Sequence, residues 1–142
     1  MLINRLFVSL ATICAFASAV SADEPVDVGM IQLLANPAKF HGKRIRVEGF
    51  LHAQFEDECL YLSKEDADFL NGKHSFWMSY SNHLSAAPKK PLDYFDGKRV
   101  LVIGVFDKNE GGHLGAAAGG IKDVSDIMEQ TRWFDGKKQL KK

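Results

Sequence analysis

The spacing of the five histidines decides whether they could bind a metal ion. No histidine stands two or four positions from another, so no single strand or helix would direct two imidazoles at one ion. A metal site would need His52, His74 and His113 to converge from separate strands at one end of the fold. We keep a small metal-dependent or hydrolytic enzyme using these three histidines as the alternative function. The main interpretation requires no metal and no cofactor.

Two acidic clusters could supply paired carboxylates or calcium ligands. They are Glu56-Asp57-Glu58 and the run Glu65-Asp66 with Asp68. Neither has the alternating oxygen ligands and the turn glycine of a calcium loop. The first is typical of a polar turn, and the second of an acidic first helical turn, which the helix dipole favours. No serine stands in a nucleophile-elbow context, so we predict no catalytic residue.

The aromatic residues offer a better candidate for a binding face. Trp77 alternates with Phe76, Met78 and Tyr80, so the two sets should face opposite sides of a strand. The pattern leaves open which set lies in the core and which faces outward. Stacking of ligands on exposed aromatic rings is common on small barrels. The candidate ligand-binding residues are Tyr61, Trp77, Tyr80, His52 and His113.

Strands must position most of these side chains. Apolar alternation predicts strands at 44–48 (with its parity continuing to Phe55), 59–62, 75–80 and 98–106, and context alone predicts one at 113–121. Three short helical segments are also predicted: one after an Asp27 N-cap that ends at Asn36-Pro37, one from Lys64 to Leu70 capped by Ser63, and a turn at 124–130.

One stretch of sequence occurs twice. Residues 40–51 (FHGKRIRVEGFL) return 55 positions later as residues 95–106 (FDGKRVLVIGVF). Both copies read aromatic, turn, Gly-Lys-Arg, strand, glycine, apolar. The repeat predicts two paired strands of one small barrel, with a bend or close backbone approach at Gly49 and Gly104.

These stretches resemble a little-characterised group of small exported bacterial proteins of OB-fold type. The likeness is carried by the KRIRVEGF stretch, by Leu60-Tyr61-Leu62-Ser63, by the second Gly-Lys-Arg-Val strand and by Gly112-His113-Leu114-Gly115, within residues 26–123. The resemblance implies a mainly β (α+β) fold, a five-stranded OB-like barrel with one or two short helices. It carries over no catalytic residue, and it implies a ligand- or partner-binding module.

Residues 1–22 have the three-part layout of a secretory signal. Arg5 precedes an apolar stretch of about 11 residues, too short to span a bilayer, and small residues follow. We expect cleavage after Ala22, with Ala19 as the rival site. Ile13 before Cys14 argues against a lipid anchor. We therefore predict export to the periplasm or medium, with no membrane anchor after processing.

The mature chain, residues 23–142, is predicted to be a single OB-like domain with a short basic C-terminal tail. Arg5 is the one charged residue before it, so 17 basic residues stand against 18 acidic ones, a formal charge of −1. Nucleic-acid binders usually carry a clear basic excess, so we predict no nucleic-acid ligand. Cys59 has no partner for an internal disulfide and is expected to be buried. The main hypothesis is a non-enzymatic binding module of the bacterial cell envelope, with a protein partner or a small polar molecule as its ligand.

Overall fold

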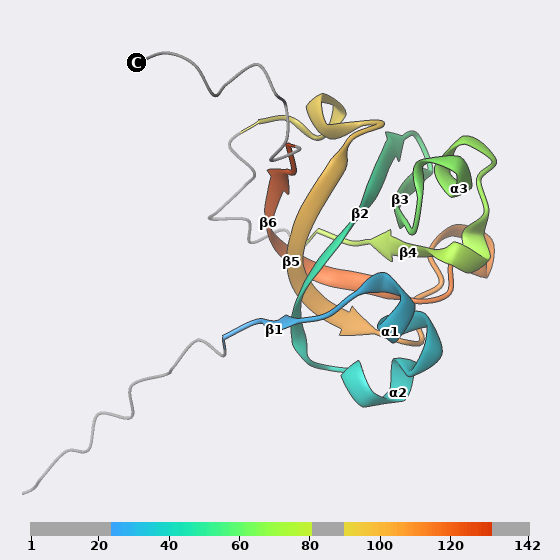
Figure 1. Cartoon of the computed structure of the whole chain (residues 1–142). Coiled ribbons are helices and arrows are strands. Elements are labelled where there is room, and N and C mark those ends of the chain that lie inside the picture. Colours follow the sequence, from blue (N-terminus) through green and yellow to red (C-terminus); the bar gives the residue numbers. More distant parts are fainter. Residues whose placement is uncertain (1–23, 81–89, 132–142) are drawn as a thin grey trace, which may run out of the picture.

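The computed structural model describes residues 24–80 and 90–131 and is mainly β, with six strands in one sheet and a few short helical segments (Figure 1). The predicted mainly β class is therefore confirmed. The predicted signal peptide, its cleavage at Ala22 and the basic tail lie outside the described residues. Among the described residues, no helix is long and apolar enough to cross a membrane.

The strands are β1 (Val26–Asp27), β2 (Arg44–Gln54), β3 (Asp57–Tyr61), β4 (Ser75–Met78), β5 (Arg99–Asp107) and β6 (Gly120–Glu129). The α-helices are α1 (Met30–Ala35), α2 (Pro37–Phe40) and α3 (Lys64–Asp68), and the 3-10 turns are η1 (Gly72–His74), η2 (Leu92–Phe95) and η3 (His113–Gly115).

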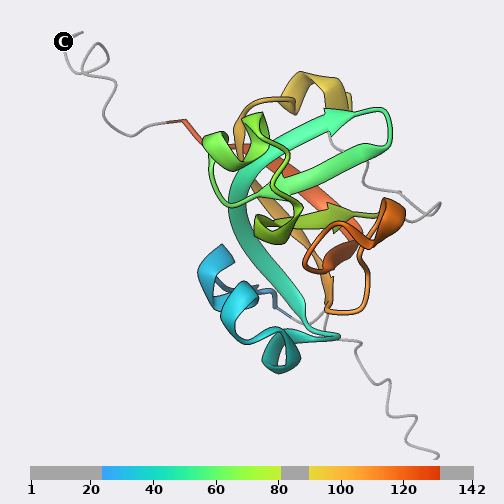
Figure 2. The same cartoon turned by 90° about the vertical axis from the view of Figure 1, so that its right-hand side faces the viewer.

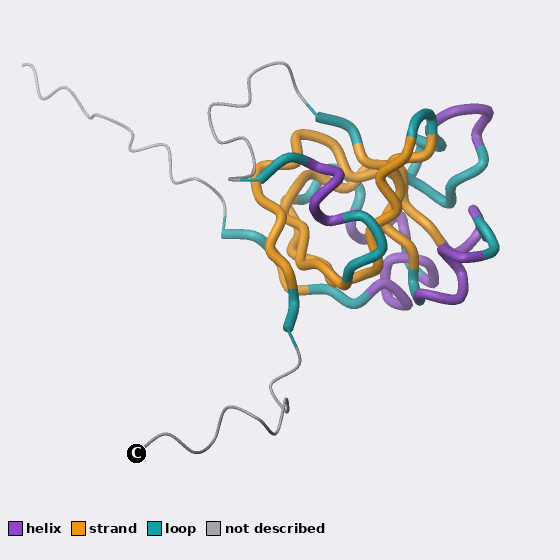
Figure 3. The backbone as a smooth tube through the Cα atoms, turned by 90° about the horizontal axis from the view of Figure 1, so that it is seen from above, coloured by secondary structure: helices purple, strands orange, loops and turns teal. Residues whose placement is uncertain are grey.

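The strands follow the order β1-β2-β3-β4-β6-β5, and β5 also pairs back with β2. Seen from above, they run around a common centre, with one helical segment drawn over that centre and the others to one side of the ring (Figure 3). The ring of pairings is uneven. Antiparallel β2 and β5 pair from Arg44 to Phe50, whereas the parallel seam between β4 and β6 holds only Trp77 opposite Gly120 and Met78 opposite Ile121.

The sequence repeat forms the β2–β5 pair, and its two copies are related by a local two-fold axis. Val47 lies opposite Val102, its equivalent in the other copy, at the centre of the pair. The entry turns close the two ends in the same way. The Gly42 N–H donates to the Phe106 carbonyl oxygen over 2.8 Å, and the Gly97 N–H donates to that of Leu51 over 2.8 Å.

The two mid-strand glycines allow neighbouring chain segments to approach closely. A Cβ on Gly49 would lie 2.7 Å from Leu60 Cγ and 2.8 Å from the Tyr61 carbonyl oxygen. A Cβ on Gly104 would lie 2.6 Å from Ile121 Cγ2. The close approach predicted from the repeat is thus present at both glycines.

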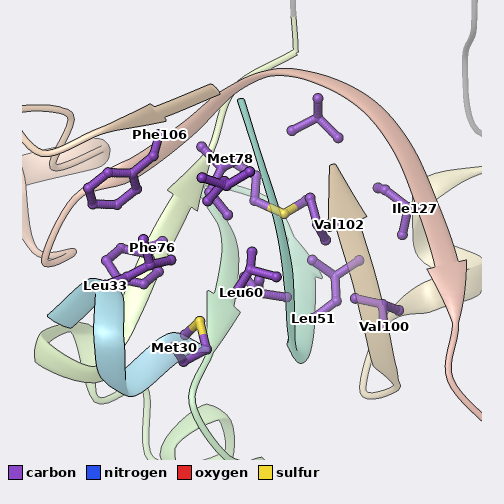
Figure 4. Close-up of a cluster of buried hydrophobic side chains, with 14 of the residues drawn as sticks. Met30, Leu33, Leu51, Leu60, Phe76, Met78, Val100, Val102, Phe106 and Ile127 are labelled. Atoms are coloured by element: carbon purple, nitrogen blue, oxygen red, sulfur yellow. The ribbon is translucent and has the colours of Figure 1, made fainter. Parts of the chain in front are cut away.

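A single apolar core fills the centre of the sheet. Alternate residues of β2, β3, β4 and β5 point inward, because successive side chains of a strand face opposite sides. Met30 and Leu33 of α1 lie at the same end of this core as Phe76 (Figure 4). The short leading helix therefore covers one end of the core.

Two predictions of secondary structure were wrong: the N-cap at Asp27 and the elements assigned between residues 113 and 130. Asp27 does not cap α1: it lies in β1 with its carboxylate 3.0 Å from Arg46, and Gly29 occupies the N-cap. Residues 120–129 form strand β6, where we predicted a strand at 113–121 and a helical turn at 124–130. The buried apolar side chains of β6 are Ile121, Val124 and Ile127, a spacing of three that imitates a helix. It arises because the pairing with β5 shifts register near Gly104 and Asp123 has a left-handed backbone, φ 48°.

Candidate functional site

The outward face of β3 and β4 carries a second, smaller apolar cluster. Leu60 and Phe76 point into the core, so Cys59, Tyr61 and Trp77 point to the other side. Ala67 of α3 and Ala117 pack against this outward set. Figure 2 views this side of the sheet, with α3 in green and the segment around η3 in orange.

A cleft of about 250 Å³ opens on this face, between the β2–β3 turn, the end of α3 and the segment 111–117. The aromatic floor combines Tyr61 with the half-buried Trp77. The indole packs tightly on Gly112, where a Cβ would lie 2.3 Å from the ring. The structure thus brings together three of the predicted ligand-binding residues, since His113 also lines this cleft.

Asp57 organises the polar side of the cleft. Its carboxylate accepts a hydrogen bond of 3.2 Å from the buried Tyr61 hydroxyl and lies 3.1 Å from His52 Nδ1. Burial, followed by the nearby Cys59 and Asp57, raises the pKa of Tyr61, so the hydroxyl stays a donor. His52 itself borders a neighbouring groove with Lys64 and Asp68. His52 therefore contacts Asp57 from outside the cleft and does not line the cleft itself.

Cys59 also faces the cleft, as a buried neutral thiol. Burial, and then its hydrogen bond with Asp57, raises the pKa of Cys59 to about 12. The thiolate is the nucleophilic form, so this cysteine is chemically quiet at neutral pH. The prediction of a buried Cys59 is confirmed.

The rim of the cleft holds three non-glycine residues in the left-handed backbone region: Glu56 (φ 61°), Leu70 (φ 51°) and Leu114 (φ 59°). Leucine rarely adopts this conformation, which costs about 1–2 kcal/mol relative to the right-handed region. Leu70 is 57% exposed and Leu114 is 91% exposed, so neither side chain is held there by the core. Such strain concentrates at binding sites.

The three histidines of the alternative hypothesis do not form one metal-binding group. His52 contacts Asp57, His74 lies 2.8 Å from Asp66, and His113 lies 4.0 Å from Glu56. Within residues 24–80 and 90–131, no cluster of three histidine, cysteine or acidic side chains could hold a metal ion.

Tyr80, also predicted to bind a ligand, does not line this cleft. It packs against the main core, on the side shared by Phe76 and Met78 and opposite Trp77. Burial, and then the charge of Glu58, raises the pKa of the Tyr80 hydroxyl. That hydroxyl is buried and has no hydrogen-bond partner in the described part of the chain. The strand alternation that separated Trp77 from Tyr80 was the correct signal.

Sequence reasoning missed Asp57, Leu70 and Leu114 as parts of the site. Asp57 was assigned to a solvated turn and Leu70 to a helix end. Leu114 was assigned to a strand, although an isolated leucine inside the glycine-rich segment 111–120 was a usable signal.

No family model and no curated protein matches this chain. Among solved structures, the chain is similar to a putative aspartyl-tRNA synthetase from Leishmania major Friedlin, at 14% identity and a TM-score of 0.45. The match covers 80% of this chain and 23% of that chain, so this chain spans about a quarter of the synthetase. A likeness this distant assigns no activity.

Proposed function

We propose that this chain is a non-enzymatic binding module of the bacterial cell envelope, built on an OB-like barrel and binding a protein partner in the cleft beside Trp77. The observation that carries the proposal is the pair of exposed leucines, Leu70 and Leu114, held in a strained backbone at the rim of that cleft. An asparagine or glycine would fit both positions at lower cost, so a function that needs exposed apolar side chains accounts for them.

The OB-like barrel is supported by the ring of pairings through β2, β3, β4, β6 and β5. Antiparallel pairs make up the ring except at the parallel seam between β4 and β6. Location in the envelope is supported by the signal-like pattern of residues 1–22, whose cleavage after Ala22 intact-mass measurement would test.

A protein partner is favoured over a small molecule by the exposed apolar rim. Besides the two leucines, Phe55 is 92% exposed in the β2–β3 turn, next to Glu56 of the cleft. Exposed apolar side chains that gather around a concave site are typical of protein interfaces.

The proposal is tested by site-specific photo-cross-linking in envelope extract. A photoreactive amino acid at Leu114 should give a discrete adduct, which excess unlabelled protein competes away and which Leu70→Asp abolishes. The same probe at Ile31, 68% exposed on α1, is the matched control. Equal labelling from both positions, or an adduct that survives Leu70→Asp and competition, would contradict the proposal.

A further inference from the structure

We infer that the cleft beside Trp77 holds a lysine or arginine side chain of the partner protein. The inference rests on the proposed function and names the group that the cleft recognises. Three properties of the described lining residues carry it: their charge, their aromatic rings and the apolar rim.

The charged lining residues are acidic. Glu56 and Asp57 both border the cleft, with side chains 56% and 27% exposed, and neither a lysine nor an arginine is among its described lining residues. Tyr61 and His52 hold the Asp57 carboxylate in place before a ligand arrives. Among the described lining residues His113 is the one basic group, 4.0 Å from Glu56, while His52 contacts Asp57 from outside the lining.

The larger groove beside α1 differs in that its acidic residues are paired with arginines. That groove, of about 510 Å³, also contains two acidic residues. There Asp27 lies 3.0 Å from Arg46, and Glu48 lies 2.9 Å from Arg99. Its charges are thus balanced within the chain, whereas the lining of the cleft beside Trp77 supplies no arginine or lysine for its two carboxylates.

The rest of the cleft suits a cation carried on an apolar stem. The rings of Tyr61 and Trp77 line it, and aromatic faces attract ammonium and guanidinium groups. Leu70 and Leu114 at the mouth would pack along the methylenes of a long basic side chain, which prefer apolar surface. The volume of about 250 Å³ is suited to one side chain rather than to a folded segment.

Other occupants fit less well. An acidic or phosphorylated group would meet two carboxylates, and like charges repel at this range. A purely apolar side chain would remove water from Glu56 and Asp57 without supplying a counter-charge, which is unfavourable.

The experiment compares blocked tripeptides Ac-Ala-X-Ala-NH2, with X as lysine, arginine, norleucine or glutamate. Binding is followed by the NMR shift of the Trp77 indole N–H in a Trp133→Phe background, where Trp77 is the remaining tryptophan. We expect the lysine and arginine peptides to bind at least about tenfold more tightly than norleucine, and the glutamate peptide to leave the signal unmoved. Glu56→Gln should remove most of this preference. Glu65→Gln makes the same charge change on an exposed residue of α3 outside the cleft and should leave the preference intact.

Equal binding of the lysine and norleucine peptides, or equal effects of Glu56→Gln and Glu65→Gln, would overturn the inference. If this happens while the cross-linker at Leu114 still yields its competed adduct, the cation site is wrong and the binding module stands. Failure of both experiments overturns both proposals.

Discussion

Leu70 and Leu114 come from different elements, yet both adopt a left-handed backbone at the rim of the same cleft. Leu70 follows α3 and Leu114 lies within η3. Both side chains are largely exposed, so burial in the core does not repay the backbone strain. At these two positions, therefore, we expect the leucine side chains to contribute to binding and not to the stability of the fold.

Replacing either leucine by asparagine should therefore not weaken the fold. Leu70→Asn and Leu114→Asn are each expected to leave the free energy of unfolding unchanged or to raise it by about 1 kcal/mol, since asparagine adopts this conformation more readily. Urea titration measures this, and the Leu114 cross-linked adduct should be lost in Leu70→Asn. Ile31→Asn, exposed in a helical backbone, should bring no gain. A loss above about 1 kcal/mol would show that the leucines serve the core.

Replacing either mid-strand glycine, Gly49 or Gly104, by a larger residue should destabilise the fold for steric reasons. Gly49→Ala and Gly104→Ala are expected to lower the free energy of unfolding by about 1–3 kcal/mol, because each new Cβ would overlap a neighbouring segment. Gly42 provides the contrast. A Cβ there meets no atom within 4 Å, but its φ is +74°, so Gly42→Asn should be milder than Gly42→Ala, while Gly49→Asn should be worse than Gly49→Ala. Unchanged urea midpoints for both alanine variants at 49 and 104 would contradict the close approach.

The Cys59 thiol should react slowly in the folded protein. In a Cys14→Ser background, where Cys59 is the remaining cysteine, we expect the reaction with Ellman's reagent to be at least about 100-fold slower than in urea, because burial raises the thiol pKa to about 12. Leu114→Cys in the same background supplies an exposed thiol as the control. A native Cys59 that reacts at the rate of this control would refute its burial.

Acid should weaken the contact between β5 and β6. The hydrogen bond from Lys122 Nζ, over 2.6 Å, holds the pKa of Asp107 below its ordinary value of 3.8. A lowered native pKa means that the unfolded chain binds the proton more readily, so this stabilisation is present above pH 3.8 and is lost as pH falls through the native value.

Asp107→Asn and Lys122→Gln should each be less stable than the parent protein at neutral pH, with a difference that shrinks on acidification through this window. Urea midpoints between neutral pH and about pH 2 measure the effect. A difference that stays constant over this range would show that the pair is not the cause.

Nucleic acid should bind weakly if at all. The chain after residue 22 carries a formal charge of −1, and a phosphate-tracking groove needs several uncompensated cations. We expect no single-stranded oligonucleotide to bind more tightly than about 10 μM at physiological salt. Fluorescence anisotropy tests this. Sub-micromolar binding that falls steeply with salt and is lost in Trp77→Ala would instead make Trp77 a base-stacking platform.

The central strands could be predicted from sequence because both signals, the apolar alternation and the repeated entry turn, lie within the sequence of each strand and the turn before it. The repeat identified β2 and β5 as paired strands and marked both sites of close approach. Strand β6 could not be found in this way. Its apolar spacing follows from a register shift in the pairing with β5. Residues 120–129 alone cannot predict that shift, because it depends on the partner strand.

The candidate site could be predicted only in part, for a similar reason. Tyr61, Trp77 and His113 were chosen by residue type, and they do meet at one cleft. Tyr80 was also chosen by residue type, although strand alternation places it on the side opposite Trp77. It lies on the core side of the sheet. The roles of Asp57, Leu70 and Leu114 depend on the backbone conformation of turns and on contacts between separate elements, and neither follows from alternation.

The local two-fold symmetry of β2 and β5 has a consequence for how the chain folds. Val47 and Val102 stand 55 positions apart, so their pairing must close a long loop, which is slow compared with the β2–β3 hairpin. β6, the last strand of the described residues, pairs with β4 at the parallel seam and with β5 along its outer side. Neither the two-fold pair nor the seam can form until most of the chain has been synthesised. For a protein exported as we propose, this late closure would leave the sheet incomplete, and the chain easier to pass through a membrane channel, until β5 and β6 are available.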